Sequence, residues 1–136
     1  MSLANIQHKY EQSLQLSSLQ NWLTTNQNKL ILKGLSGSAL SFVLAEIYKK
    51  SSYSILLILE EKEEAAYIFN DLETLITDKP ILFYPASYKR PYQIEETDNA
   101  NILLRSEVLN KINSNRNPLL TVTYPDALFE KVITKT

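Results

Sequence analysis

The chain has 136 residues, 44% of them hydrophobic, and its 14 Lys and Arg residues nearly balance its 15 Asp and Glu residues, for a formal net charge of −1. This length is typical of one domain with a single core. A balanced charge disfavours the strong, sequence-independent binding to DNA or RNA that needs a basic surface. The lack of Cys and the single histidine, His8, exclude disulfides, thiolate chemistry and the usual zinc sites.

The sequence contains no membrane or secretion signal. No segment reaches the roughly 18 apolar residues of a membrane-spanning helix, and the N-terminus lacks the apolar stretch of a secretory signal. We therefore expect a soluble, cytoplasmic protein. Residues 1–24 are predicted to form an N-terminal helical segment, and residues 25–136 an α/β domain.

The N-terminal part predicts a helix, a strand and a second helix. Residues 10–23 carry leucines and a tryptophan at spacings that favour a helix docked on the domain. Residues 29–33 are a short apolar run typical of a strand, and a tight loop follows at 34–38. The next helix begins near residue 39 and repeats apolar residues at the helical spacing: Leu40, Val43, Leu44 and Ile47.

The middle of the chain predicts two strands around a helix. Residues 53–59 are apolar without interruption after Ser54, which favours a central strand covered on both faces. Residues 61–76 form an amphipathic helix with an acidic first turn. Residues 81–84 are a short strand, and a loop of roughly a dozen residues follows at 85–96. Loops of this length tend to be functional or to mark the site of an excised insertion.

The C-terminal part predicts a helix at 99–113, a strand at 119–123 and a short helix at 127–132 that begins near Pro125. We expect the apolar residues of the longer helix to face the core: Ala100, Leu103, Leu104, Val108 and Ile112. Strands that alternate with helices indicate an α/β fold with a mainly parallel sheet of about four short strands and flanking helices.

Both glycines of the chain lie in the loop between the first predicted strand and its helix, where nucleotide-binding domains hold phosphate. Aligned on Gly34, the Walker A pattern G-x-x-x-x-G-K-[ST] finds alanine in place of its second glycine and leucine in place of its lysine, and keeps only the final hydroxyl. The degenerate phosphate loop comprises Gly34, Ser36, Gly37, Ser38, Ala39, Leu40 and Ser41.

The missing lysine weakens triphosphate binding by roughly 10–150-fold, since a hydrogen bond to a charged group contributes about 1.5–3 kcal/mol. We interpret the loop as vestigial and kept for its turn geometry. Residual binding of an anion or nucleotide is the alternative, because the N–H groups near Ser38 and Ala39 would still face outward at a helix N-terminus. No catalytic residue, metal site or cofactor is expected in this chain.

The loop at 85–96 interleaves aromatic and basic side chains, which favours an interaction loop. Its candidate contact residues are Tyr88, Lys89, Arg90 and Tyr92. Glu95 and Glu96 follow and cancel the local charge, so a surface or interdomain contact is favoured, with contact to nucleic acid as the alternative.

Several motifs in order resemble a known family. They are residues 33–39 (KGLSGSA), 70–72 (NDL), 83–86 (FYPA), 91–92 (PY), 105–109 (RSEVL) and 122–129 (VTYPDALF). Together, over roughly residues 22–132, they resemble the N-terminal region of the bacterial transcription-repair coupling factors, the Mfd family. That region is in turn similar to the first domain of the repair protein UvrB, which has an intact Walker A loop.

The resemblance implies a P-loop, helicase-like fold without the ATPase, with residues 25–136 as the first half of a UvrB-like domain. It also implies that the chain is a scaffold and interaction module of an ATP-dependent DNA translocase that removes stalled RNA polymerase and recruits excision-repair proteins. In that family ATP and Mg²⁺ belong to a motor that also binds DNA, while UvrA and RNA polymerase bind through other domains. The alternatives are a nucleotide-binding P-loop enzyme domain and a nucleic-acid-binding domain of a helicase-like protein.

Overall fold

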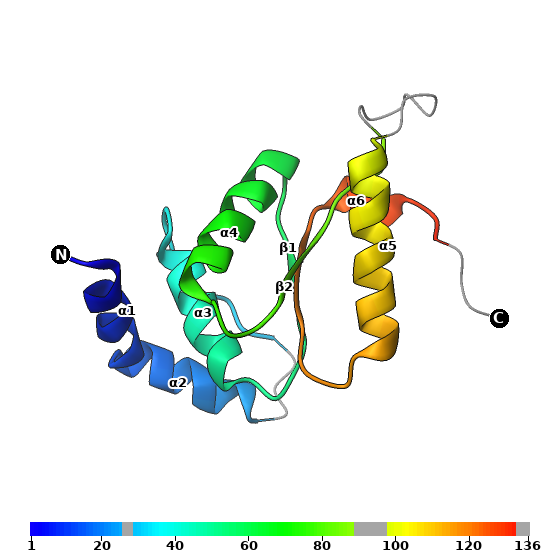
Figure 1. Ribbon diagram of the computed structural model, residues 1–136. Coiled ribbons are helices and arrows are strands. Elements are labelled where there is room, and N and C mark those ends of the chain that lie inside the picture. Colours follow the sequence, from blue (N-terminus) through cyan, green and yellow to red (C-terminus); the bar gives the residue numbers. More distant parts are fainter. Residues whose placement is uncertain (26–28, 89–97, 133–136) are drawn as a thin grey trace.

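The computed structural model of the chain describes residues 1–25, 29–88 and 98–132, which form six helices and a three-stranded sheet (Figure 1). The helices are α1 (Leu3–Glu11), α2 (Leu14–Leu23), α3 (Ala39–Lys50), α4 (Lys62–Leu75), α5 (Asn99–Ser114) and α6 (Pro125–Phe129). The strands are β1 (Ile55–Ile58), β2 (Ile81–Tyr84) and β3 (Leu120–Thr123). None of the helices in these ranges has the length and apolar character needed to cross a membrane.

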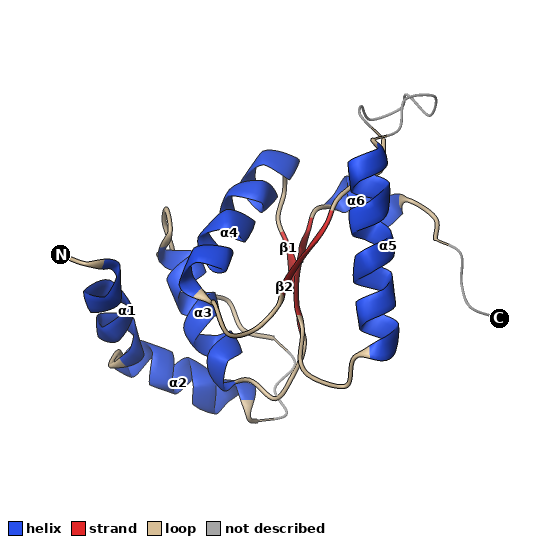
Figure 2. Cartoon of the chain, in the orientation of Figure 1, coloured by secondary structure: helices blue, strands red, loops and turns tan. Residues whose placement is uncertain are grey.

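The three strands are parallel and lie in the order β1-β3-β2. The register pairs Leu120 of β3 with Ile55 on one side and with Ile81 on the other. Figure 2 shows the sheet between α4 and α5, with α3 beside α4 and the first two helices outside α3. This arrangement confirms the predicted α/β fold with a parallel sheet and flanking helices.

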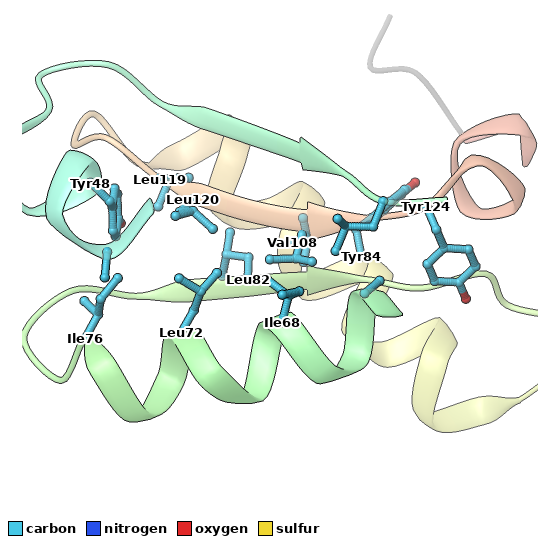
Figure 3. Packing of buried hydrophobic residues seen from close by; sticks show 14 of the residues in the cluster. Tyr48, Ile68, Leu72, Ile76, Leu82, Tyr84, Val108, Leu119, Leu120 and Tyr124 are labelled. Carbon is cyan, nitrogen blue, oxygen red and sulfur yellow. The ribbon is translucent and has the colours of Figure 1, made fainter. Parts of the chain in front are cut away.

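The core lies between the sheet and its helices (Figure 3). Ile68 and Leu72 of α4 point toward the sheet, and Leu120 and Val122 of β3 are completely buried. All four residues of β3 are buried, as expected for the middle strand of a parallel sheet. The Tyr48 hydroxyl at the end of α3 donates to the carbonyl oxygen of Pro80, 2.9 Å away, and so joins this helix to the segment before β2.

Two predictions about the sheet are wrong within the described residues. The sheet has three strands rather than about four, because residues 29–33 form no strand. Their apolar side chains are exposed, and two of them, Leu30 and Leu32, line an apolar pocket of about 410 Å³ next to α2 and α3. The segment at 53–59 supplies an edge strand, β1, and not the central one, since apolarity does not determine which strands pair.

Helix boundaries also differ from the prediction at two places. The N-terminal helix is divided into α1 and α2, because the Ser13 side chain accepts a hydrogen bond from the Leu16 amide and starts a new helix. The last helix begins at Pro125, which occupies its first turn, and ends at Phe129 rather than at residue 132.

Helix α5 turns a different face to the core than its apolar pattern predicts. Of the five apolar residues expected to face inward, only Val108 is buried, while Leu103 is 70% exposed. The other buried residue of α5 is Arg105, which donates hydrogen bonds to the carbonyl oxygens of Pro85 and Ala127. Arg105 and Val108 therefore mark the buried face of α5.

Candidate functional site

The loop at 34–38 is a tight turn whose backbone depends on its two glycines. Gly34 and Gly37 have φ values of +84° and +55°, a left-handed conformation that other residues rarely adopt. The Ala39 amide donates to the carbonyl oxygen of Ser36 at 3.1 Å. The expectation that this amide faces outward is therefore wrong, because the turn itself uses it.

Three side chains of the degenerate phosphate loop make contacts within the protein: those of Ser38, Leu40 and Ser41. Leu40, at the position of the Walker A lysine, packs against the hydrophobic core. The hydroxyl of Ser41 is buried and donates to the Asp71 carboxylate on α4 at 3.0 Å. The Ser38 hydroxyl lies 3.5 Å from that of Tyr67, also on α4. These contacts attach the N-terminal end of α3 to α4.

The predicted interaction loop is described only at its start. Tyr88 is 37% exposed and follows β2 closely. Lys89, Arg90 and Tyr92 lie outside the described residues. The structure therefore brings Tyr88 to the carboxyl end of the sheet and leaves the prediction for the other three residues as it stands.

A buried ion pair beside this loop was not predicted from the sequence. Arg105 and Glu130 are 2.9 Å apart, and their side chains are only 8% and 10% exposed. Arg105 also donates to the carbonyl oxygens of Pro85 at 2.8 Å and Ala127 at 2.9 Å. Its guanidinium carbon lies 4.2 Å from the centre of the Tyr84 ring, within reach of a cation–π interaction.

Further hydrogen bonds tie the segment after β2 to the segment after β3. The Glu130 carboxylate accepts from the Ser87 amide at 2.8 Å and from the Ser87 hydroxyl at 2.6 Å. The Tyr124 hydroxyl accepts from the Ala86 amide at 2.8 Å. We call Arg105, Glu130, Ser87 and Tyr124 the carboxyl-end cluster.

The tyrosines of this region are held in their neutral form. Burial raises the pKa of Tyr84 above its ordinary value, although the nearby Arg105 opposes the effect. Burial also raises the pKa of the Tyr124 phenol. Arg105 and Glu130 form an ion pair and hydrogen-bond to the backbone of Pro85, Ala127 and Ser87, so the cluster holds the segments after β2 and β3 together.

One signal in the sequence could have indicated this cluster. Arg105 lies three residues before Val108, which places a charged side chain on the same helix face as a core residue. Such a position is typical of an arginine with buried partners. The partner itself, Glu130, follows a different strand, and nothing in the linear pattern joins the two.

The chain is similar in sequence to a transcription-repair-coupling factor. It is 27% identical over 116 residues to that protein from Bacillus subtilis (strain 168), and the match covers 85% of the chain. The chain corresponds to 10% of the length of that relative. No protein-family model matches the chain, and no solved structure matches it.

Proposed function

We propose that the chain is a noncatalytic N-terminal module of a bacterial transcription-repair coupling factor and acts as a scaffold and interaction domain. The observation that carries this proposal is the 27% identity over 85% of the chain to the Bacillus subtilis factor. The packing of Leu40 against the core and the hydrogen bond from Ser41 to Asp71 favour a role without ATP turnover.

The proposal assigns the chemistry of repair to other parts of a longer cytoplasmic protein. ATP and Mg²⁺ would act in a motor that moves along DNA, and UvrA and RNA polymerase would bind through other domains. This module would contact other domains of the same polypeptide, with the loop after β2 among its contact regions.

Calorimetry with Mg-ATP separates this proposal from a P-loop enzyme. We expect no saturable heat up to low-millimolar nucleotide and no release of phosphate by the purified chain. Micromolar affinity, or an ATPase activity that Ser41→Ala abolishes, would support the enzyme instead. The double variant Ala39→Gly, Leu40→Lys restores two Walker A residues and should still give no turnover, since hydrolysis also needs carboxylates that position Mg²⁺ and water.

A fluorescence titration separates the proposal from a nucleic-acid-binding domain. With a net charge of −1, the chain should bind duplex DNA no more tightly than about 10⁻⁴ to 10⁻⁶ M at physiological salt. Nanomolar binding that weakens steeply with salt would contradict the proposal.

Strand-specific repair in cells tests the function itself. After ultraviolet irradiation, deletion of the gene should slow the removal of lesions from the transcribed strand to the rate of the other strand. Unchanged preference for the transcribed strand would overturn the assignment to a coupling factor.

A further inference from the structure

An apolar pocket lies between α2, the C-terminal part of α3 and the start of β1 (Figure 1). Its volume is about 410 Å³, within the range of about 300–1,000 Å³ that small-molecule sites occupy. Most of its lining is aliphatic or aromatic, and includes Leu19 and Trp22 of α2, Leu30, and Leu44 and Ile47 of α3. None of the described residues that line it is charged, so a ligand would bury an apolar part here.

A smaller pocket of about 140 Å³ adjoins the first and adds polar groups to it. The two share Leu23 and Ile47, whereas Gln20 and Lys50 line the smaller one alone. The amide nitrogen of Gln20 is buried and, in the part of the chain that the structure describes, has no hydrogen-bond partner. Native proteins pair nearly all such donors, because an unpaired one lowers stability. We call the two pockets together the α2–α3 pocket.

The polar end of the α2–α3 pocket favours an anion. Lys50 is the one charged residue among the described residues that line it, and it forms no ion pair with any of them. The negative end of the α3 dipole is offset, since Lys79 donates to the carbonyl oxygens of Tyr48 at 2.9 Å and Lys49 at 3.1 Å. A donor at Gln20 and a cation at Lys50 are the groups that a carboxylate requires.

We propose that the α2–α3 pocket binds an aliphatic carboxylate of the fatty-acid class, with its chain in the larger pocket and its carboxylate toward Gln20 and Lys50. One apolar chamber with one cationic end matches an amphiphile that carries a single negative charge. A wholly apolar ligand would leave the Gln20 donor without an acceptor, and a polyanion would find one cation only. This proposal does not depend on the coupling-factor function.

Trp22 allows a direct measurement, because it lines the pocket and is the single tryptophan of the chain. Decanoate, added below the concentration at which it forms micelles, should change the Trp22 fluorescence saturably. Octanoate should bind about 15-fold more weakly, since it buries two fewer methylene groups. Decanol, which has the same chain and no charge, should also bind more weakly than decanoate. Equal or tighter binding of decanol would overturn the proposal, as would the absence of a saturable change with decanoate.

Variants of the polar end locate the carboxylate. Lys50→Gln should weaken decanoate binding by about fivefold and leave decanol binding unchanged. Lys111→Gln is the matched control, because Lys111 lies on α5 and does not line the pocket, and its affinity for decanoate should equal that of the wild type. Gln20→Leu should weaken decanoate binding without lowering the melting temperature, since it removes an unpaired buried donor. Equal losses in the two lysine variants would show nonspecific attraction and exclude the site.

The product of the complete gene provides the last test, because the chain corresponds to 10% of the length of the Bacillus subtilis relative. Calorimetry with that product should give the same affinity for decanoate and the same loss in Lys50→Gln. Binding by the 136-residue chain alone would show that another part of the polypeptide covers the pocket, and would overturn the proposal.

Discussion

The ion pair between Arg105 and Glu130 shows how burial changes the effect of a charge on stability. An exposed pair contributes about 0–1 kcal/mol, because water screens it. Removing one partner of a buried pair lowers stability much more, because the other charge then stays buried and unpaired in a region of low polarity. The carboxyl-end cluster of this protein is of the second kind.

We predict that Arg105→Ala lowers the free energy of unfolding by about 3–5 kcal/mol, because it leaves the Glu130 carboxylate buried and unpaired. The matched control is Glu107→Gln in the same helix. Glu107 pairs with Lys111 at 3.1 Å, but these side chains are 59% and 42% exposed. Its removal should change stability by less than about 0.5 kcal/mol. Urea denaturation measures both effects, and equal losses in the two variants would contradict the prediction.

The buried tyrosines predict a loss of stability at alkaline pH. Burial raises the pKa of Tyr124 above the ordinary 10.0, so the folded state holds its phenolic proton more tightly than the unfolded state. This contribution to stability is fully present below about pH 10 and is lost as the pH rises through the higher folded-state pKa. Burial also raises the pKa values of Tyr48 and Tyr84, so these residues add to the loss of stability at alkaline pH.

Urea midpoints measured between pH 8 and pH 11.5 test this prediction. Tyr124→Phe should be less stable than the wild type at pH 8 by about 1 kcal/mol, because the Ala86 amide loses its acceptor. The difference should narrow above pH 10, since phenylalanine cannot ionise. A constant difference across the whole range would show that the Tyr124 proton is not linked to folding.

At the scale of elements, the hydrogen bond between Ser41 and Asp71 joins α3 to α4. We predict that Ser41→Ala lowers stability by about 1 kcal/mol, and that a double-mutant cycle with Asp71→Ala gives a coupling energy of about 0.5–1.5 kcal/mol. The cycle is measured by urea denaturation with and without Mg-ATP. A coupling energy near zero would show that the contact adds nothing to stability, and a change with ATP would restore a nucleotide role for Ser41.

From residue 39 onward the order of helices and strands was predictable from the sequence, whereas the faces that the elements turn to the core were less so. The boundaries of α4 agree closely with the predicted helix at 61–76, because its apolar residues repeat at the helical period and its first turn is acidic. The face of α5 could not be predicted from apolarity, since the carbonyls that hold Arg105 come from other segments. Likewise, the two glycines of the loop predict a tight turn, but they do not predict that the Ala39 amide donates to the Ser36 carbonyl oxygen.

At the scale of the whole molecule, β1 is an edge strand with the composition of a central one. Among the described residues it pairs with β3 alone, so its outer N–H and C=O groups lack a neighbouring strand. Leu56 and Ile58 are 57% and 51% exposed, and residues 53–59 contain no charge. Protein edges normally carry lysine, proline or a bulge that prevents pairing with another chain, and this edge has none of them in its sequence or strand pattern.

We predict that the isolated chain self-associates through β1 as its concentration rises, and that Leu56→Lys suppresses this association. The lysine replaces an exposed side chain and leaves the partly buried Ile55 and Leu57 in place, so the free energy of unfolding should change by less than about 0.5 kcal/mol. Leu103→Lys is the control, because it removes an equally apolar and more exposed residue from α5, where the backbone is already hydrogen-bonded within the helix. Sedimentation velocity over a range of concentrations measures the association of the wild type and of the two variants. A larger effect at position 103 would show that exposed apolar area alone drives association, and monomeric wild type at all concentrations would show that the β1 edge does not pair.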